Sequence, residues 1–275
     1  MSDNQLIGLA EDFFQNSLDS SPTSAIMRGH KKYFDQIEEL TEDQFQKEKE
    51  TVDNFIQRLE AIEKDNLTSR EKVTHGMLEF ALSSNQDSLL DRSWEFGAGV
   101  SGFTGFLIDY NQQMFVPDSE SADMMLKRLE LYKRLYTQIA EVQKEGLNNN
   151  RVATERNLLR TIDQLENYLA SSLDQDPLLL VNFSPEISGS EISEWKDKAK
   201  NIIEANIRPT VSAYLDQLKT EHLPKGRGDD KCGIMWIDGG EESYLRSLRK
   251  YTGHKATTVK EVHEIGLSEI ERLKK

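Results

Sequence analysis

Residues 41–62 read TEDQFQKEKETVDNFIQRLEAI, and this stretch decides the fold class. It opens with Thr41 and Gln44 at the spacing of a capping box, in which the two side chains satisfy free N–H groups at the start of a helix. The apolar residues that follow recur three, four and seven positions apart: Phe45, Val52, Phe55, Ile56, Leu59 and Ile62. This period places them on one face, so the stretch predicts an amphipathic helix packed against a core.

The same signals recur on both sides of this stretch. A second capping box, Thr68 with Glu71, predicts a helix whose apolar residues are Val73, Met77, Leu78, Ala81 and Leu82. Asp118 or Ser119 is expected to cap a long helix that ends near Gly146, a residue type typical of helix C-caps. Further helices are predicted at about residues 4–14, 22–27, 152–171, 190–223, 240–251 and 258–274.

The interruptions of this pattern give the domain organisation. Pro209 is expected to kink or split the helix around it, because proline lacks a backbone N–H. The stretches 174–190 and 224–240 are predicted as connections, and no stretch alternates apolar and polar residues as a half-buried strand would. We therefore predict an all-α fold of about ten helices without significant sheet. The helices are expected to form one domain over residues 1–275, with a possible subdivision near 174–190.

Charge and composition argue against several classes of partner. The 275 residues include 48 acidic and 34 basic ones, which gives a formal net charge of -14. Nucleic acids and anionic membranes both attract basic surfaces, so we expect neither as a partner. The N-terminus has no basic and apolar leader, and Cys232 is the only cysteine. We therefore expect a soluble protein of the reducing cytoplasm.

Histidine spacing tests for a zinc-peptidase site. Such a helix needs two histidines four residues apart and a glutamate directly after the first. His263-Glu264 begins like this motif, but position 267 is Leu267. The remaining histidines also lack a second histidine at that spacing: His30, His75, His222 and His254. We therefore expect no catalytic residue, no cofactor-binding residue and no metal ligand in this chain.

Three weaker features leave alternatives open. His75 and Glu79 could share a helical face as part of a metal site, although a salt bridge or a partly buried histidine is the commoner role of such a pair. Cys232 follows Lys231, and a cation lowers a thiol pKa, but no histidine stands nearby to support a nucleophile. Residues 97–106 hold four glycines without the strand and Lys-Ser or Lys-Thr of a phosphate loop, which favours helix packing or a flexible connection.

Several stretches together resemble one known family. Residues 240–252, beginning Gly-Glu-Glu-Ser-Tyr-Leu, and residues 257–267, Thr-Thr-Val-Lys-Glu-Val-His-Glu-Ile-Gly-Leu, resemble the motif GxxYYxxxLxxxTTTxLTPEEIHxLGL of the domain-of-unknown-function 885 family. Residues 24–33, Ser-Ala-Ile-Met-Arg-Gly-His-Lys-Lys-Tyr, are similar to its entry motif SATxxGxHxYD. The sequence departs from the pattern at Phe34, where an acid is usual, and at residues 253–255.

The resemblance implies a role within a larger protein. The family is mostly bacterial and zinc-metallopeptidase-like, and the matched stretches correspond to its N-terminal half. The family's His-Glu-x-x-x-His-like zinc motif lies downstream of that half, so zinc is expected only in a full-length member. The chain would then be a non-catalytic lobe that meets a C-terminal catalytic lobe or a peptide substrate. The alternative is a stand-alone helical binding or regulatory protein that has lost the catalytic half.

Overall fold

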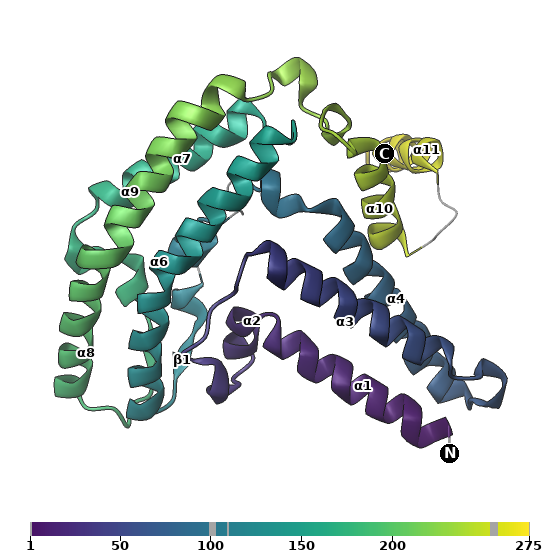
Figure 1. Ribbon diagram of the computed structural model, residues 1–275, viewed down its shortest axis with the longest axis horizontal. Helices are drawn as coiled ribbons and strands as arrows, with labels where there is room; N and C mark the ends of the chain where they lie inside the picture. The colour runs from purple at the N-terminus through teal and green to yellow at the C-terminus, as the bar shows by residue number, and fades with distance from the viewer. Residues whose placement is uncertain (1, 99–102, 109, 254–257, 275) are drawn as a thin grey trace. The chain divides into compact units, whose positions relative to one another are not determined.

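The computed structural model describes residues 2–98, 103–108, 110–253 and 258–274. Within these ranges the only strands are a two-residue parallel pair, β1 (Phe115–Val116) and β2 (Asn182–Phe183), and most other residues are helical (Figure 1). The predicted all-α class is therefore confirmed. The α-helices are α1 (Ser2–Asp19), α2 (Pro22–Met27), α3 (Glu42–Glu60), α4 (Ser69–Asp91), α5 (Gly105–Ile108), α6 (Ser119–Asn148), α7 (Glu155–Ala170), α8 (Gly189–Ile202), α9 (Arg208–Gln217), α10 (Gly240–Thr252) and α11 (Val259–Leu273).

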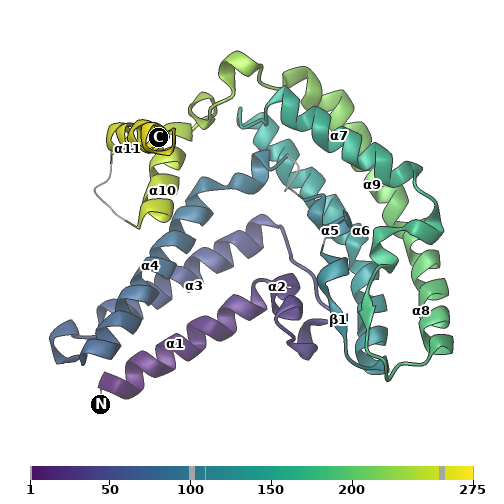
Figure 2. The ribbon, with the colours of Figure 1, turned by 180° about the vertical axis from the view of Figure 1, so that it is seen from behind.

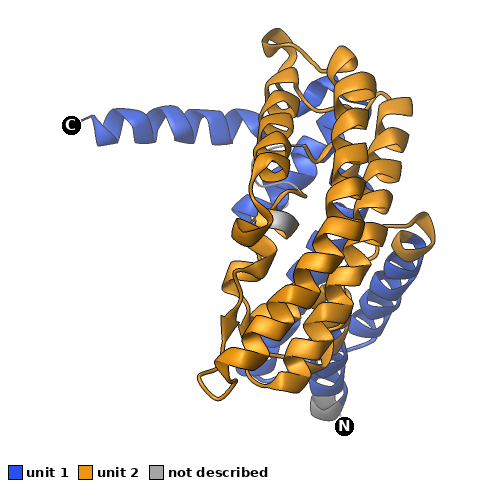
Figure 3. Cartoon of the chain, turned by 90° about the vertical axis from the view of Figure 1, so that its left-hand side faces the viewer, with its two compact units in different colours: residues 1–13, 46–93, 233–275 blue, residues 14–45, 94–232 orange. Residues whose placement is uncertain are grey.

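The chain divides into two compact units (Figure 3). Unit 1 comprises residues 1–13, 46–93 and 233–275, and unit 2 comprises residues 14–45 and 94–232. The stretch 174–190, where the sequence suggested a subdivision, lies inside unit 2, and the boundaries between the units fall elsewhere. That the whole chain forms one domain stays a prediction.

Unit 2 is built around α6. Helices α8 and α9 pack against α6, and α7 packs against α9, as both views of the ribbon show (Figures 1 and 2). The buried face of α6 includes Leu129, Tyr132, Leu135, Tyr136 and Ile139, all without solvent exposure. The Tyr132 hydroxyl donates a 2.9 Å hydrogen bond to the Phe106 carbonyl, and burial raises the pKa of Tyr132 to about 12.

The predicted effect of Pro209 takes the form of a π-helical turn. Residues Ile203–Ile207 are π-helical and lead directly into α9, whose second residue is Pro209. Proline cannot donate to the preceding turn, and widening that turn lets the chain remain helical past the missing N–H. A second π-helical turn, Leu218–His222, follows α9, so the helical segment that begins at α8 continues to the start of the connection predicted at 224–240.

Unit 1 packs the first part of α1 with the antiparallel helices α3 and α4. Its core is apolar and consists of Leu6, Leu9, Val52, Phe55, Leu59, Ile62, Leu67, Leu78 and Leu82. Helix α10 lies along α4, where Arg246 pairs with Asp91 at 2.5 Å and Arg249 pairs with Asp87 at 3.0 Å. The capping boxes predicted before α4 and α11 are both present, because Thr68 and Thr258 each accept from the backbone three residues ahead.

Two predictions about individual residues were wrong. Val73 and Met77 were expected among the apolar core residues of α4, but 62% and 69% of their surfaces are exposed. The buried stripe of α4 instead runs through His75, Leu78 and Leu82, and Val73 and Met77 lie together on the opposite face of the helix. Gly146 is not a C-cap: α6 continues to Asn148, and Gly146 lies inside it against the backbone of Glu95.

Candidate functional site

The sequence-predicted candidates do not gather into one site. His263 lies on the exposed helix α11, and Cys232 is an exposed free thiol. His254 and part of the glycine-rich stretch 97–106 lie outside the described residues. Among the residues that the structure does describe, no group of three or more His, Cys, Asp or Glu side chains is arranged to hold a metal ion. The absence of a metal and of a catalytic residue stays a prediction.

His75 and Glu79, by contrast, do line the same cavity. We call it the α3–α4 groove, and it has a volume of about 510 Å³. It lies between the C-terminal half of α3 and α4, in unit 1, and reaches the turn that follows α3. Its lining consists of Ile56, Leu59, Glu60, Ile62, Glu63, Lys64, His75, Glu79, Leu82, Ser83 and Gln86. Its size is typical of cavities that hold small molecules.

Helix geometry explains how α4 lines this groove. His75, Glu79, Leu82, Ser83 and Gln86 follow one another at intervals of four, three, one and three residues, which is one continuous stripe of a helix. Two contacts fix the antiparallel register of α3 against α4. The Gln86 amide donates to the Asp53 carboxylate at 3.0 Å, and Lys64 pairs with Glu79 at 3.0 Å at the other end.

His75 is the unusual group in the groove. Its surface is only 4% exposed, and its Nε2 atom is buried without a hydrogen-bond partner among the described residues. A buried polar atom is normally hydrogen-bonded, because burial without a partner costs about 1–3 kcal/mol. Because His75 lines the groove, a small shift of its ring would let this unpaired nitrogen meet a ligand or a water molecule.

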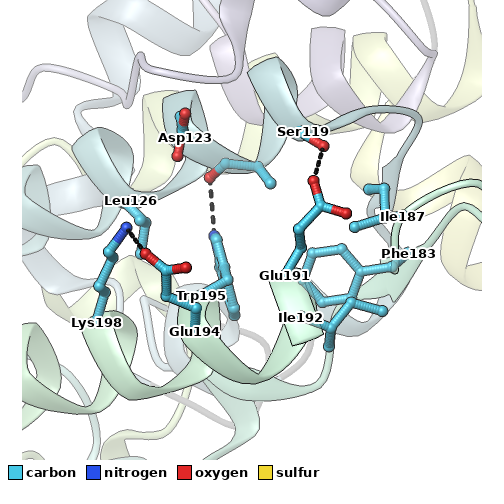
Figure 4. Close-up of a pocket in the computed structure, with 11 residues that line it drawn as sticks. Ser119, Asp123, Leu126, Phe183, Ile187, Glu191, Ile192, Glu194, Trp195 and Lys198 are labelled. Atoms are coloured by element: carbon cyan, nitrogen blue, oxygen red, sulfur yellow. Dashed lines mark hydrogen bonds and ion pairs between the residues drawn. The ribbon is translucent and has the colours of Figure 1, made fainter. Parts of the chain in front are cut away.

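A second cavity lies in unit 2 between the N-terminal turns of α6 and α8, and we call it the α6–α8 pocket (Figure 4). It has a volume of about 230 Å³. Its wall is held together by its own side chains: Trp195 Nε1 donates to the Ala122 carbonyl at 2.8 Å, and Ser119 donates to Glu191 at 2.8 Å (Figure 4). These two hydrogen bonds hold α8 against α6. Because their donors and acceptors already have partners, these groups account for the packing of the two helices and do not by themselves indicate a ligand.

Two carboxylates, Asp118 and Glu191, lie at the helix N-termini beside the α6–α8 pocket. Asp118 caps α6, and hydrogen bonds from Lys31 and then from Ser121 lower its pKa to about 2. Hydrogen bonds from Ser188 and Ser119 lower the pKa of Glu191 below its usual range. Both carboxylates are ionised at neutral pH, as is usual for acids at helix N-termini.

A third cavity, the α4–α10 cleft, follows the contact between α4 and α10 in unit 1. Its volume is about 410 Å³, and Phe80, Asp87, Arg249 and Lys250 are among its lining residues. Arg249 donates to both oxygens of Asp87, at 3.0 and 3.2 Å, so these two charges neutralise each other. The α3–α4 groove is therefore the best candidate site, because it alone of these three cavities has a lining residue with a buried polar side-chain atom that lacks a partner.

The sequence indicated only part of the groove. It placed His75 and Glu79 on one face of the helix that follows Thr68. It placed Ile56, Leu59 and Ile62 on the apolar face of the preceding helix. The rim residues Glu60, Glu63 and Lys64 were missed, because they come beside Glu79 only when α3 and α4 fold back on each other. No local pattern in the sequence predicts such a contact between distant residues.

Within the described residues, no helix has the length and apolar character that crossing a membrane requires.

Comparison with known proteins shows the family and the fold. No curated protein matches the chain. A solved structure, described as that of "the putative lipoprotein from Colwellia psychrerythraea", shares the fold with a TM-score of 0.81 at 15% sequence identity. The match covers 99% of this chain and 49% of that chain, so this chain spans about half the length of the solved protein. The family described as "Bacterial protein of unknown function (DUF885)" matches residues 22–275, and the chain therefore belongs to this family.

Proposed function

We propose that the chain is a non-catalytic helical lobe of a metallopeptidase-like protein, and that unit 1 presents an apolar surface to a second polypeptide part. In this proposal the zinc ion and the catalytic residues belong to the second part, which lies on the C-terminal side. Peptide substrate is bound between the two parts. The observation that carries the proposal is the uncovered apolar face of α11.

Helix α11 is amphipathic, yet none of its residues is buried. Its exposed apolar side chains include Val259, Ile270 and Leu273, which recur on one helical face, with 45%, 50% and 73% of their surfaces exposed. Figure 3 shows α11 as the segment of unit 1 that ends at the C-terminus and projects away from the other helices of that unit. Because an amphipathic helix is stabilised mainly by packing its apolar face, a partner surface is expected for it.

Unit 1 exposes further apolar side chains. Val73, Met77 and Phe80 recur along one face of α4 at helical spacing, and all three are exposed. Most large apolar residues that the described parts of the chain expose belong to unit 1, although it is the smaller unit. Those in unit 2 are Phe14, Met27, Phe115, Leu159 and Leu180. This concentration is typical of a surface that another protein part covers.

The length of the solved relative also supports the proposal. This chain corresponds to 49% of that protein, so the shared fold is known in a chain about twice as long. Membership of the family supports the same architecture, and the metallopeptidase-like activity of the whole protein is part of the proposal. The alternative is a stand-alone helical binding protein, which the α3–α4 groove and its unpaired His75 favour.

The α11 surface can be tested with a dye that becomes fluorescent on exposed apolar surface, such as 1-anilinonaphthalene-8-sulfonate. We expect the chain to bind the dye and the variant Ile270→Gln/Leu273→Gln to bind less. Because both side chains are exposed, the variant should unfold within about 0.5 kcal/mol of the wild type. The matched control is Leu159→Gln/Leu180→Gln, which removes two similarly exposed leucines from unit 2 and should leave dye binding nearly unchanged. Equal dye binding by wild type and the α11 variant would contradict the proposal.

A further inference from the structure

The α3–α4 groove combines three features that point to one class of ligand. Its walls are apolar where Leu59, Ile62 and Leu82 line it, and all three belong to the buried core of unit 1. Its rim is acidic. The lining also includes His75, whose buried Nε2 atom has no hydrogen-bond partner among the described residues. Each feature selects for a different part of a ligand.

The rim carries more negative than positive charge. Three carboxylates line the groove, from Glu60, Glu63 and Glu79, against one ammonium group from Lys64. Lys64 pairs with Glu79 at 3.0 Å, and Glu63 accepts from the Asn66 amide at 2.7 Å. Glu60 makes no ion pair with any residue in the described part of the chain. The uncompensated carboxylates attract a cation.

The imidazole of His75 adds a directional requirement. A neutral imidazole offers one nitrogen that accepts and one that donates, and His75 uses neither in a hydrogen bond with the described residues. A ligand with several N–H donors can satisfy both the imidazole acceptor and the carboxylate oxygens. A metal ion fits less well, because the described residues provide no cluster of three ligating side chains.

We propose that the α3–α4 groove binds a small primary amine that carries an apolar body. The ammonium group lies at the acidic rim within reach of His75, and the apolar body lies against Leu59, Ile62 and Leu82. The volume of about 510 Å³ is sufficient for an amine with an aliphatic chain or a single ring. This inference does not depend on the lobe proposed above, because no residue of α11 lines the groove.

The test is a titration of the 15N-labelled 275-residue chain with n-hexylamine, followed by NMR of the backbone amides and the His75 imidazole. 1-Hexanol and hexanoate serve as neutral and anionic ligands with the same apolar body. We expect saturable shifts with n-hexylamine, concentrated at residues 56–64 and 75–86. Binding of 1-hexanol should be roughly tenfold weaker, and hexanoate should bind more weakly still, because only the ammonium group gains charge-assisted hydrogen bonds.

Variants separate the rim from a general charge effect. The change Glu60→Gln/Glu63→Gln should weaken n-hexylamine binding by roughly three- to fivefold, since these carboxylates are exposed and partly screened. Glu50→Gln removes an exposed acid from α3 that does not line the groove, and it should leave the affinity unchanged. Equal binding of n-hexylamine and 1-hexanol would overturn the assignment to an amine. Absence of saturable shifts with any of the three ligands would overturn the site itself.

Discussion

Replacing Gly146 with alanine is expected to lower the free energy of unfolding of unit 2 by about 2–3 kcal/mol. A β-carbon at this position would lie 2.4 Å from the carbonyl oxygen of Glu95 and 2.6 Å from its β-carbon. These atoms belong to the backbone and to the root of a buried side chain, so they cannot rotate away, and the helix α6 must shift instead. Such overpacking typically costs about 1–3 kcal/mol, more than the helix propensity that alanine adds.

Urea unfolding followed by tryptophan fluorescence measures this effect, because two of the three tryptophans, Trp94 and Trp195, lie in unit 2. The matched control is Gly189→Ala at the start of α8, where an added β-carbon meets no atom within 4 Å. That variant should be neutral or slightly stabilising. If Gly146→Ala is as stable as Gly189→Ala, the close approach of α6 to residue 95 is wrong.

The change Asp176→Asn is expected to destabilise unit 2 by about 3–5 kcal/mol. The Asp176 side chain has no solvent exposure and accepts from Arg208 Nη2 at 3.0 Å and Nε at 3.2 Å. The Arg208 side chain is only 18% exposed. Asparagine keeps the shape but removes the charge, which leaves a mostly buried guanidinium without its counterion.

The control for this prediction is an exposed ion pair in the same unit. Arg156 and Asp229 approach to 2.6 Å, but both side chains are more than 60% exposed. Asp229→Asn should therefore change the free energy of unfolding by less than about 1 kcal/mol. The two variants are compared by urea unfolding at neutral pH. Similar losses for both would show that burial of the Asp176–Arg208 pair does not carry the effect.

Local signals in the sequence predicted most of the helices. The boxes Thr68 with Glu71 and Thr258 with Glu261 mark helix starts through contacts within four residues, and both are present in the structure. The predicted segment 22–27 corresponds to α2 for the same reason, because Pro22 favours the first turn. Such contacts depend on neighbouring residues alone, so a single sequence is sufficient to predict them.

Features that depend on distant residues were not predictable in this way. Gly146 was predicted to end a helix. Its actual role is to leave room for the backbone of Glu95, some fifty positions away in the sequence. Val73 and Met77 read as core residues, but the orientation of α4 against α3 buries His75 in their place. The rim of the α3–α4 groove arises from the same packing of α4 against α3.

The cytoplasmic location inferred from the sequence stays a prediction.

Unit 1 exposes two apolar surfaces that a second polypeptide part is expected to cover. An exposed apolar face on α11 and an apolar stripe on α4 are unfavourable in water, and a second polypeptide part would remove both from solvent. The α3–α4 groove is separate from these surfaces and would keep its ligand with or without that part.

The most direct measurement is to read the gene past the codon for Lys275. We predict that the open frame continues into a helical segment with two histidines spaced as zinc ligands and a glutamate beside the first. This chain would then be the non-catalytic lobe of a zinc peptidase, and activity should be assayed on the whole protein. A stop codon directly after Lys275 would contradict the account, and the protein would then be a stand-alone helical binding protein.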